Sequence, residues 1–350
     1  MTILALALFT IAQTPVPTRV ACVGASIVAG VGTTDPAKTS FPAQLQRLLG
    51  PGYEVRNFGN SGKAVTKAHP WSYWNVPEFA AAKAFNADIV VISMGTNDAV
   101  PEYWPKVRDD FVDDLEDLVA TFRKQKNHPK VFVGAPPPVH DDPRRQNFEE
   151  ETLPLIRQAA REVHAPLIDF HNALASHPDW YNDQIHPNDE GAWSMALEAY
   201  FAIGDTRAMK KDWKVVSADS EQSDEGPAIN AIDGDPGTYW HTQWSPKTDK
   251  YPHEIVIDFG KSLGVSGIRY TPRQDGGVNG RVKEFEVYIS DDKATWGAVA
   301  ATGTLPDRLA PTVYTFKAPA TGRYLKFVAK SEAHGGPWTT VGELDVIPRR

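Results

Sequence analysis

Along the first two hundred residues, short apolar runs alternate with segments in which apolar residues recur every three or four positions. Short apolar runs bounded by Gly or Pro are typical of buried strands, and the longer spacing is typical of amphipathic helices. The predicted strands cover Arg19–Val23, Tyr53–Phe58, Ala87–Met94, Lys130–Ala135 and Pro166–Phe170. The predicted helices cover Phe41–Leu49, Phe111–Lys124, Leu153–His164 and Glu190–Phe201. Strands separated by helices predict an α/β domain whose parallel sheet is covered on both faces.

The pattern changes near Gly204–Trp213, where helical periodicity disappears. The rest of the chain has short alternating runs punctuated by Gly, Pro, Asn and Asp, which is typical of an all-β sandwich. These runs are Glu254–Phe259, Gly267–Tyr270, Lys283–Ile289, Val313–Phe316, Arg323–Ala329 and Glu343–Ile347. We therefore predict two domains, residues 18–208 and 212–350, with a boundary near Lys210–Asp212.

Residues 1–17 form a separate N-terminal segment that contains an apolar run, Met1–Ala12. The run ends in small residues, as the core of a secretory signal does, although no Lys or Arg precedes it and the first is Arg19. Two interpretations stay open: a signal peptide of a secreted or periplasmic protein, or an apolar segment packed on the domain. No other stretch is long and apolar enough for a membrane span, so none is expected.

Composition narrows the range of partners. The 350 residues suffice for two globular domains, and 41% of them are hydrophobic. A formal net charge of −8 argues against binding to nucleic acid or to an anionic membrane surface and favours a neutral substrate. The single cysteine, Cys22, lies in an apolar run, which predicts a buried thiol and excludes an intrachain disulfide.

Candidate catalytic residues follow the predicted strands, because ligands of parallel sheets bind beyond the carboxyl ends of the strands. Ser26 follows the first strand and can act as a nucleophile. His186, before the last helix, can accept the Ser26 proton and later protonate the leaving alcohol, and Asp183 can orient the imidazole. The backbone N–H groups of Ser26 and Gly62 and the side-chain amide of Asn97 can bind an oxyanion. Acyl transfer by these groups requires no cofactor.

Each of these residues taken alone also has an ordinary structural role. A Ser after a strand is usually a turn or cap residue, and the same holds for Gly62 and Asn97. Asp183 and His186 could form a capped turn or part of a metal site. Competing motifs fail, because position 28 of Gly24-Ala25-Ser26-Ile27-Val28 is not the Gly that a nucleophile elbow needs. The joint occurrence of the candidate catalytic residues in four segments therefore favours a catalytic site.

The four segments, in this order, resemble the SGNH/GDSL hydrolase family over roughly residues 18–203. The resemblance implies a flavodoxin-like, three-layer α/β/α domain and assigns the four family residue types to Ser26, Gly62, Asn97 and His186, with Asp183 in the Asp-x-x-His block. The sequence departs from the family at Ala25, where an Asp is usual. That Asp is not the triad acid, so we expect activity to be retained.

Two further groups of residues have open interpretations. Trp71, Tyr73 and Trp74 follow Gly62 and could stack on a sugar or close over the site, or else simply pack within a long loop. His140 follows a proline-rich strand end and could face the catalytic cleft.

The β-rich region resembles the F5/8 type C (discoidin) domain, and specifically the family 32 carbohydrate-binding modules, over about residues 212–348. The resemblance is carried by the segments Ala231–Trp244, Glu254–Gly260, Tyr270–Arg273, Asn279–Arg281 and Glu284–Ser290. It implies a galactose-binding-like jelly-roll sandwich whose loops bind sugars. The implied sugar-binding residues are His241, Trp244, Arg273 and Asn279, with an acidic partner from Asp224 or Glu225. Trp240 is expected to lie in the core.

The same resemblance implies a structural Ca²⁺ at the Asp233-Gly-Asp235 segment, because carboxylate, carbonyl and hydroxyl oxygens suit this ion. The candidate ligands are Asp233, Asp235, Thr238 and Glu343. A tight Asp-Gly turn without metal is the alternative.

Together these expectations describe a secreted serine esterase that removes acyl groups, acetyl above all, from an acylated glycan or polysaccharide. A tethered sugar-binding domain would raise the local concentration of such an ester. Two alternatives stay open, a lipolytic or general short-chain esterase on the same fold and a non-catalytic, lectin-like adhesin.

Overall fold

The computed structural model describes residues 16–204 and 209–349. The chain divides into two compact units, Met1–Gly204 and Asp205–Arg350, called here the N-terminal and C-terminal units. The predicted signal segment lies almost entirely outside the described residues. Within the described ranges, no helix is both long and apolar enough to cross a membrane.

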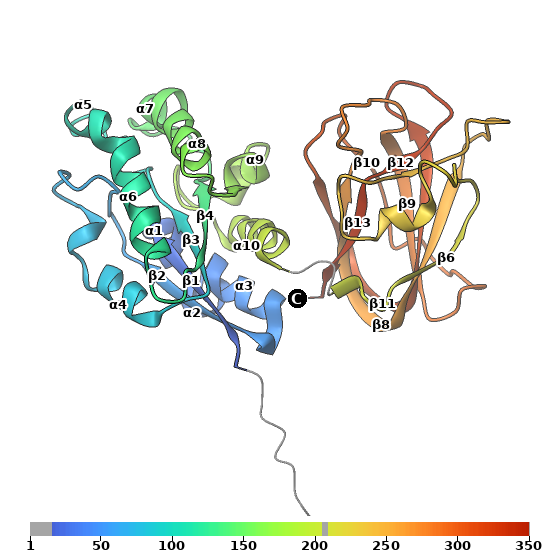
Figure 1. Ribbon diagram of the computed structural model, residues 1–350, viewed down its shortest axis with the longest axis horizontal. Coiled ribbons are helices and arrows are strands. Elements are labelled where there is room, and N and C mark those ends of the chain that lie inside the picture. The colour runs from blue at the N-terminus through green and yellow to red at the C-terminus, as the bar shows by residue number, and fades with distance from the viewer. Residues whose placement is uncertain (1–15, 205–208, 350) are drawn as a thin grey trace, which may run out of the picture. The chain divides into compact units, whose positions relative to one another are not determined.

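The N-terminal unit is built on a five-stranded parallel sheet (Figure 1). Its strands are β1 (Thr18–Gly24), β2 (Tyr53–Gly59), β3 (Ile89–Ser93), β4 (Lys130–Ala135) and β5 (Leu167–Asp169). They lie in the order β2-β1-β3-β4-β5, which confirms the predicted α/β fold. The last strand is shorter than predicted, because the Asp169 side chain accepts a hydrogen bond from the Asn172 N–H and so starts a helix.

Helices cover both faces of this sheet. The longer ones are α3 (Phe41–Leu49), α4 (Pro77–Phe85), α6 (Phe111–Arg123), α8 (Leu153–Glu162), α9 (Phe170–Leu174) and α10 (Asp189–Ile203). Short helices are α1 (Ser26–Ala29), α2 (Pro36–Thr39), α5 (Trp104–Val107) and α7 (Arg145–Asn147). Helices α4, α6 and α8 pack on one face, and α3, α9 and α10 on the other (Figure 1).

The core follows from the alternation of side chains along each strand. Ala21 and Val23 of β1 join the cluster beneath α4, α6 and α8, together with Phe79 and Phe122. Cys22 is fully buried, which confirms the predicted buried thiol, and burial raises the pKa of this thiol well above its usual value.

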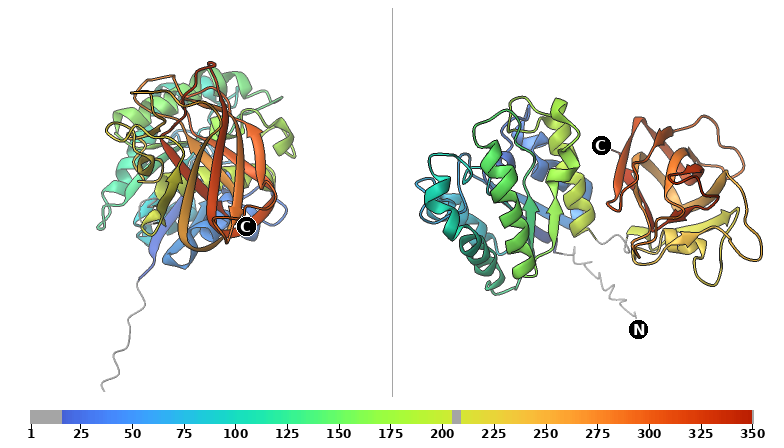
Figure 2. Two further views of the ribbon diagram at one scale, coloured as in Figure 1. Left: turned by 90° about the vertical axis from the view of Figure 1, so that its right-hand side faces the viewer. Right: turned by 90° about the horizontal axis from the view of Figure 1, so that it is seen from above.

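The C-terminal unit is an antiparallel β-sandwich, drawn from yellow to red in Figures 1 and 2. Its strands are β6 (Lys214–Ala218), β7 (Trp240–His241), β8 (His253–Thr271), β9 (Val282–Ser290), β10 (Ala301–Thr304), β11 (Thr312–Glu332), β12 (Thr340–Val341) and β13 (Glu343–Pro348). Trp240 is fully buried, as predicted, and its Nε1–H donates to the Ser220 carbonyl at 2.9 Å.

Two long strands contribute to both layers of this sandwich. The first half of β8 pairs with β6, whereas its second half pairs with β13. Strand β11 pairs with both halves of β8, with register shifts between Thr315 and Ala320 and between Gly322 and Tyr324. Each of these strands was predicted as two separate runs, because the segments 260–266 and 317–322 interrupt the apolar pattern with Gly, Pro and polar residues.

Candidate active site and a hollow in the C-terminal unit

Ser26 lies where β1 ends and the short helix α1 begins. The residue is 7% exposed, so the hydroxyl lies in a largely enclosed position. Helix α1 packs closely on β2, because a Cβ at Gly59 would come within 2.2 Å of the Ala29 nitrogen. Glycine at this position therefore lets α1, and with it Ser26, sit against the sheet edge.

Three side chains from two distant segments form a hydrogen-bonded chain. The Ser26 Oγ lies 2.9 Å from Nε2 of His186, and the His186 Nδ1 lies 2.7 Å from Oδ2 of Asp183. A carboxylate bound at Nδ1 fixes a proton on that nitrogen and leaves Nε2 to accept the serine proton. The structure thus places the three predicted triad residues in the order that acyl transfer needs.

Asp183 is held by its own turn. Its Oδ1 accepts hydrogen bonds from the backbone N–H groups of Ile185 at 2.8 Å and His186 at 2.6 Å. Partial burial by itself would raise the pKa of Asp183, but the hydrogen bonds from the His186 side chain and from both backbone N–H groups outweigh it and lower the pKa. Asp183 is therefore ionised at neutral pH, as a group that stabilises an imidazolium must be.

The predicted oxyanion residues follow β2 and β3 at the same sheet edge. Gly62 has a φ of +75°, a conformation that favours glycine. The Asn97 amide donates from Nδ2 to the Lys63 carbonyl at 2.9 Å, which joins the two loops. Its Oδ1 accepts from Nη1 of Arg144 at 3.1 Å. Because Arg144 can only donate, the Asn97 oxygen must face it and the NH₂ group must face the Gly62 loop.

Asp98 is a buried carboxylate that the sequence reasoning did not select. Its two oxygens accept from the backbone N–H of Val65, the backbone N–H of Thr66 and the Thr66 hydroxyl, at 2.8–3.0 Å. Burial raises the pKa of Asp98 from 3.8 to about 6, while these hydrogen bonds act in the opposite direction. The carboxylate therefore fixes the loop after Gly62 beside Asn97. The only sequence signal for Asp98 was its position next to Asn97, after a predicted strand.

The aromatic residues after Gly62 have different environments. Tyr73 is fully buried and donates to the Phe58 carbonyl, and Trp74 donates from Nε1 to the Val65 carbonyl. Trp71 is 39% exposed and packs edge-on against Tyr103. Packing thus accounts for Tyr73 and Trp74, whereas Trp71 is the most exposed of the three.

His140 lies near the triad acid. Together with Asp183, Tyr181 and Gln184 it lines a hollow of about 280 Å³, and its ring packs edge-on against Tyr181 with centroids 4.5 Å apart. The sequence left open whether His140 faces the cleft, and the structure places it in the same hollow as Asp183.

In the C-terminal unit, the five predicted sugar-binding residues line one hollow of about 470 Å³. Its lining is formed by Glu225, Tyr239, His241, Trp244, Arg273, Asn279 and Trp338. Tyr239 and Trp338 were missed. Side chains alternate along an extended segment, so the predicted burial of Trp240 already implied that Tyr239 points away from the core. Trp338 lies on a loop that only the fold brings here.

Arg273 makes hydrogen bonds that connect several residues at this hollow. Its guanidinium donates to Asp275 at 2.7 Å, to Oδ1 of Asn279 at 2.8 Å and to the Tyr239 hydroxyl at 2.9 Å, and it lies 4.2 Å from the Tyr239 ring centroid. The His241 Nδ1 contacts the Thr242 carbonyl at 2.6 Å, so Nδ1 carries the proton. Burial lowers the pKa of His241, which keeps the ring neutral at neutral pH.

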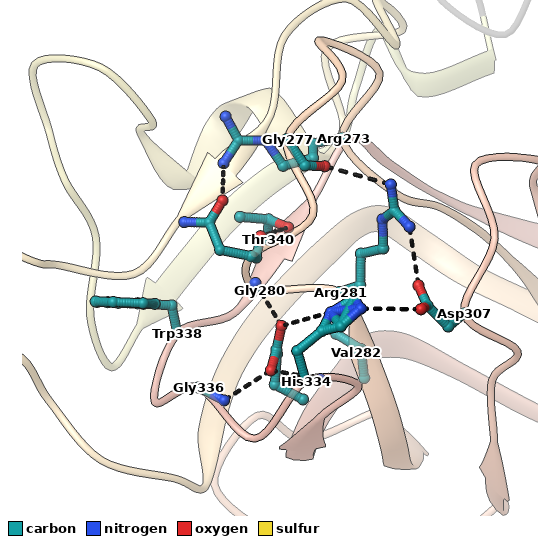
Figure 3. Close-up of polar contacts among 12 residues, drawn as sticks. Arg273, Gly277, Gly280, Arg281, Val282, Asp307, His334, Gly336, Trp338 and Thr340 are labelled. Atoms are coloured by element: carbon teal, nitrogen blue, oxygen red, sulfur yellow. Dashed lines mark hydrogen bonds and ion pairs between the residues drawn. The ribbon is translucent and has the colours of Figure 1, made fainter.

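A buried carboxylate joins the loops that carry two of the lining residues (Figure 3). Glu332, whose side chain is 1% exposed, accepts from the N–H groups of Gly280 at 3.1 Å, His334 at 2.8 Å and Gly336 at 2.7 Å. Gly280 follows Asn279, and Gly336 precedes Trp338 by two residues. Glu332 thus fixes both sides of the hollow.

The predicted calcium ligands make hydrogen bonds with one another and with neighbouring donors. Among the described residues, no three His, Cys, Asp or Glu side chains form a group that could hold a metal ion. Asp233 accepts from the Asp235 N–H and the Thr238 hydroxyl, both at 2.7 Å. Glu343 accepts from the Gly234 N–H at 2.7 Å and contacts the Lys210 ammonium.

Comparison with known proteins identifies both units. Residues 22–193 match the GDSL-like Lipase/Acylhydrolase family, and residues 215–344 match the F5/8 type C domain. The chain therefore combines a GDSL-like hydrolase domain with an F5/8 type C domain, as the motifs predicted.

Individual relatives share parts of the chain. An acetylxylan esterase from Xylanibacter ruminicola is 34% identical over 199 residues, which cover 51% of this chain and 41% of that protein. A sialidase from Micromonospora viridifaciens is 39% identical over 139 residues, which cover 39% of this chain and 21% of that protein. The family 32 carbohydrate-binding module of Clostridium perfringens NanJ, solved with galactose, is 30% identical, covers 39% of this chain and 95% of that one, and has a TM-score of 0.35. The chain thus spans less than half the length of the acetylxylan esterase and of the sialidase.

Proposed function

We propose that this chain is a carbohydrate esterase that removes acetyl groups from a glycan, with Ser26 as its nucleophile. The observation that carries the proposal is the hydrogen-bonded chain from Ser26 through His186 to Asp183, with distances of 2.9 and 2.7 Å. It connects a nucleophile, a base and an orienting carboxylate within direct hydrogen-bond reach.

In the first half of the reaction, the Ser26 Oγ attacks the ester carbonyl carbon while its proton passes to Nε2 of His186. In this proposal the tetrahedral oxyanion is bound by the backbone N–H groups of Ser26 and Gly62 and by the Asn97 side-chain amide. When the carbon–oxygen bond to the sugar breaks, His186 returns the proton to the leaving sugar oxygen. An acetyl group then remains esterified to Ser26.

In the second half, a water molecule attacks this acyl-enzyme. His186 accepts a proton from the water, the second tetrahedral oxyanion occupies the same N–H groups, and the proton returns to the Ser26 Oγ as acetate leaves. Asp183, whose lowered pKa keeps it ionised, stabilises the imidazolium in both halves. Apart from this water molecule, the proposed reaction uses only groups of the chain and needs no cofactor.

The proposed substrate rests on the second domain and on the relatives. The hollow lined by Trp244, His241 and Arg273 combines aromatic surface with polar donors, which suits the C–H face and hydroxyls of a sugar. The acetylxylan esterase relative supports an acetylated polysaccharide. Such a hollow would keep the esterase on its polymer.

The proposal is tested by acetate release from a panel of acetylated polysaccharides, with wild type and Ser26→Ala compared. Removing the nucleophile should lower kcat/KM by about 10⁴-fold or more, since a triad acts as a unit. Ser176→Ala, at an exposed serine of the same unit, serves as the matched control and should keep full activity.

The other outcomes separate the alternatives. Hydrolysis that persists in Ser26→Ala would disprove the nucleophile assignment. A preference for long-chain nitrophenyl esters over acetyl esters would favour a lipolytic enzyme. Sugar binding without hydrolysis of any ester by the wild type would favour a lectin-like adhesin.

A further inference from the structure

Lys210 is a buried cation at the start of the C-terminal unit. Its side chain is only 4% exposed, and its Nζ lies 2.6 Å from Oδ1 of Asp345 and also contacts Oε2 of Glu343. Both carboxylates belong to β13 and have side chains that are 6% exposed. Burying an ammonium group costs much free energy unless such partners surround it. The two carboxylates offset this cost for Lys210 in the folded unit.

Lys210 contacts Glu343, which is one of the residues that were expected to bind calcium. One oxygen of Glu343 accepts the Gly234 N–H, and the other contacts Lys210. Both oxygens of Asp233 accept hydrogen bonds, one from the Asp235 N–H and one from the Thr238 hydroxyl. A calcium ion needs roughly six to eight oxygen ligands with lone pairs directed at it. Here the carboxylate oxygens instead face hydrogen-bond donors, so the residues present do not fit the ion.

We propose that the Lys210 ammonium supplies the positive charge that stabilises this end of the C-terminal unit, in place of a divalent cation. Its three N–H donors can bind Glu343 and Asp345 simultaneously. Glu343 in turn fixes the Gly234 turn through its second oxygen. Glu343 therefore joins the Asp233–Thr238 turn to β13, Lys210 supplies the positive charge that offsets the burial of Glu343 and Asp345, and the folded unit is independent of calcium.

Calcium dependence is measured on the full-length protein by calorimetry, which follows the unfolding transition of each unit. The wild-type midpoints should be the same in excess EDTA and in excess CaCl₂. Terbium, a luminescent calcium mimic excited through nearby aromatic rings, should give no saturable signal with the wild type. A midpoint that falls in EDTA, or saturable terbium luminescence, would overturn the proposal even if no variant can be produced.

The role of the lysine itself is measured with Lys210→Met, which keeps the apolar stem and removes the charge. Glu343 would then be buried without its cation, and Asp345 would keep only the Arg269 guanidinium at 3.6 Å. We therefore expect the midpoint of the C-terminal transition to fall by roughly 10 °C or more. The control is Lys261→Met, at an exposed lysine of β8, which should leave the midpoint unchanged. A Lys210→Met protein as stable as the Lys261→Met control would disprove the role assigned to Lys210.

Discussion

At the scale of single residues, the proposed oxyanion site depends on the orientation of one amide group. Arg144 donates to the oxygen of Asn97, and its Nε donates to Asp142 at 2.7 Å, so the guanidinium is itself held in place. The amide nitrogen of Asn97 therefore faces the Gly62 loop, where it donates to the Lys63 carbonyl. Without Arg144 the amide could rotate and present its oxygen to the developing oxyanion, which would repel the charge.

We expect Arg144→Ala to lower kcat by roughly tenfold to a hundredfold with little change in KM, because an oxyanion donor acts mainly in the transition state. Initial rates with nitrophenyl acetate as a function of concentration measure both constants. Arg161→Ala, at an exposed arginine of α8, is the matched control. If Arg144→Ala retains the kcat of this control, Arg144 does not position Asn97.

At the scale of elements, the loop that carries Gly62 is fixed by a carboxylate from the loop after β3. Asp98 is completely buried and accepts three hydrogen bonds from Val65 and Thr66. Its pKa is about 6 in the folded protein, compared with 3.8 for an ordinary aspartate. Between these values the folded state binds more protons than the unfolded state. The stability contributed by this proton is complete below about pH 3.8 and is lost as the pH rises through about 6.

Asp98→Asn removes this titration, so wild type and variant should depend differently on pH. Between about pH 3.8 and 6 the free energy of unfolding of the wild type should fall relative to that of the variant, by roughly 2–3 kcal/mol in total. Urea unfolding of both proteins at a series of pH values measures this difference. Curves that stay parallel across the interval would show that Asp98 does not have a raised pKa.

The success of the sequence predictions also varied between elements. The central strands β1, β3 and β4 were predicted because both of their faces are buried, so each appears as a continuous apolar run. The edge strand β2 has a weaker pattern, since only Phe58 of its residues is buried. Helix α4 was missed because its Ala-rich segment lacks a strong apolar stripe. Strands β8 and β11 were each predicted as two runs, because their continuity across the layers depends on pairing with distant strands.

At the scale of the whole molecule, each unit has a hydrophobic core of its own, centred on β1 and β3 in one and on Trp240, Phe285 and Phe327 in the other. Because the cores are separate, we expect a point substitution in one unit to leave the packing of the other unit unchanged. Under the proposed function, the two units cooperate only through a polymer that both can bind.

We therefore expect Trp244→Ala to lower the rate of acetate release from a dilute acetylated polysaccharide by roughly tenfold, because tethering no longer concentrates the ester. The rate with soluble nitrophenyl acetate should not change. Trp296→Ala, at a partly exposed tryptophan outside the hollow, controls for general effects of removing an indole. Equal losses on both substrates would argue against a targeting role.

The amino-acid sequence was enough to predict the two fold classes, the positions of Ser26 and Asn97 after strands and of His186 before the last helix, and five of the residues that line the second hollow. These features depend on local periodicity and on ordered motifs, which are properties of neighbouring residues along the chain. The hydrogen bond from Arg144 to Asn97 and the contact between Lys210 and Glu343 became visible only in the folded structure. The partners in these pairs are separated by 47 and 133 positions. No local pattern specifies such pairs, because the packing of the whole unit selects the side-chain conformations that bring them together.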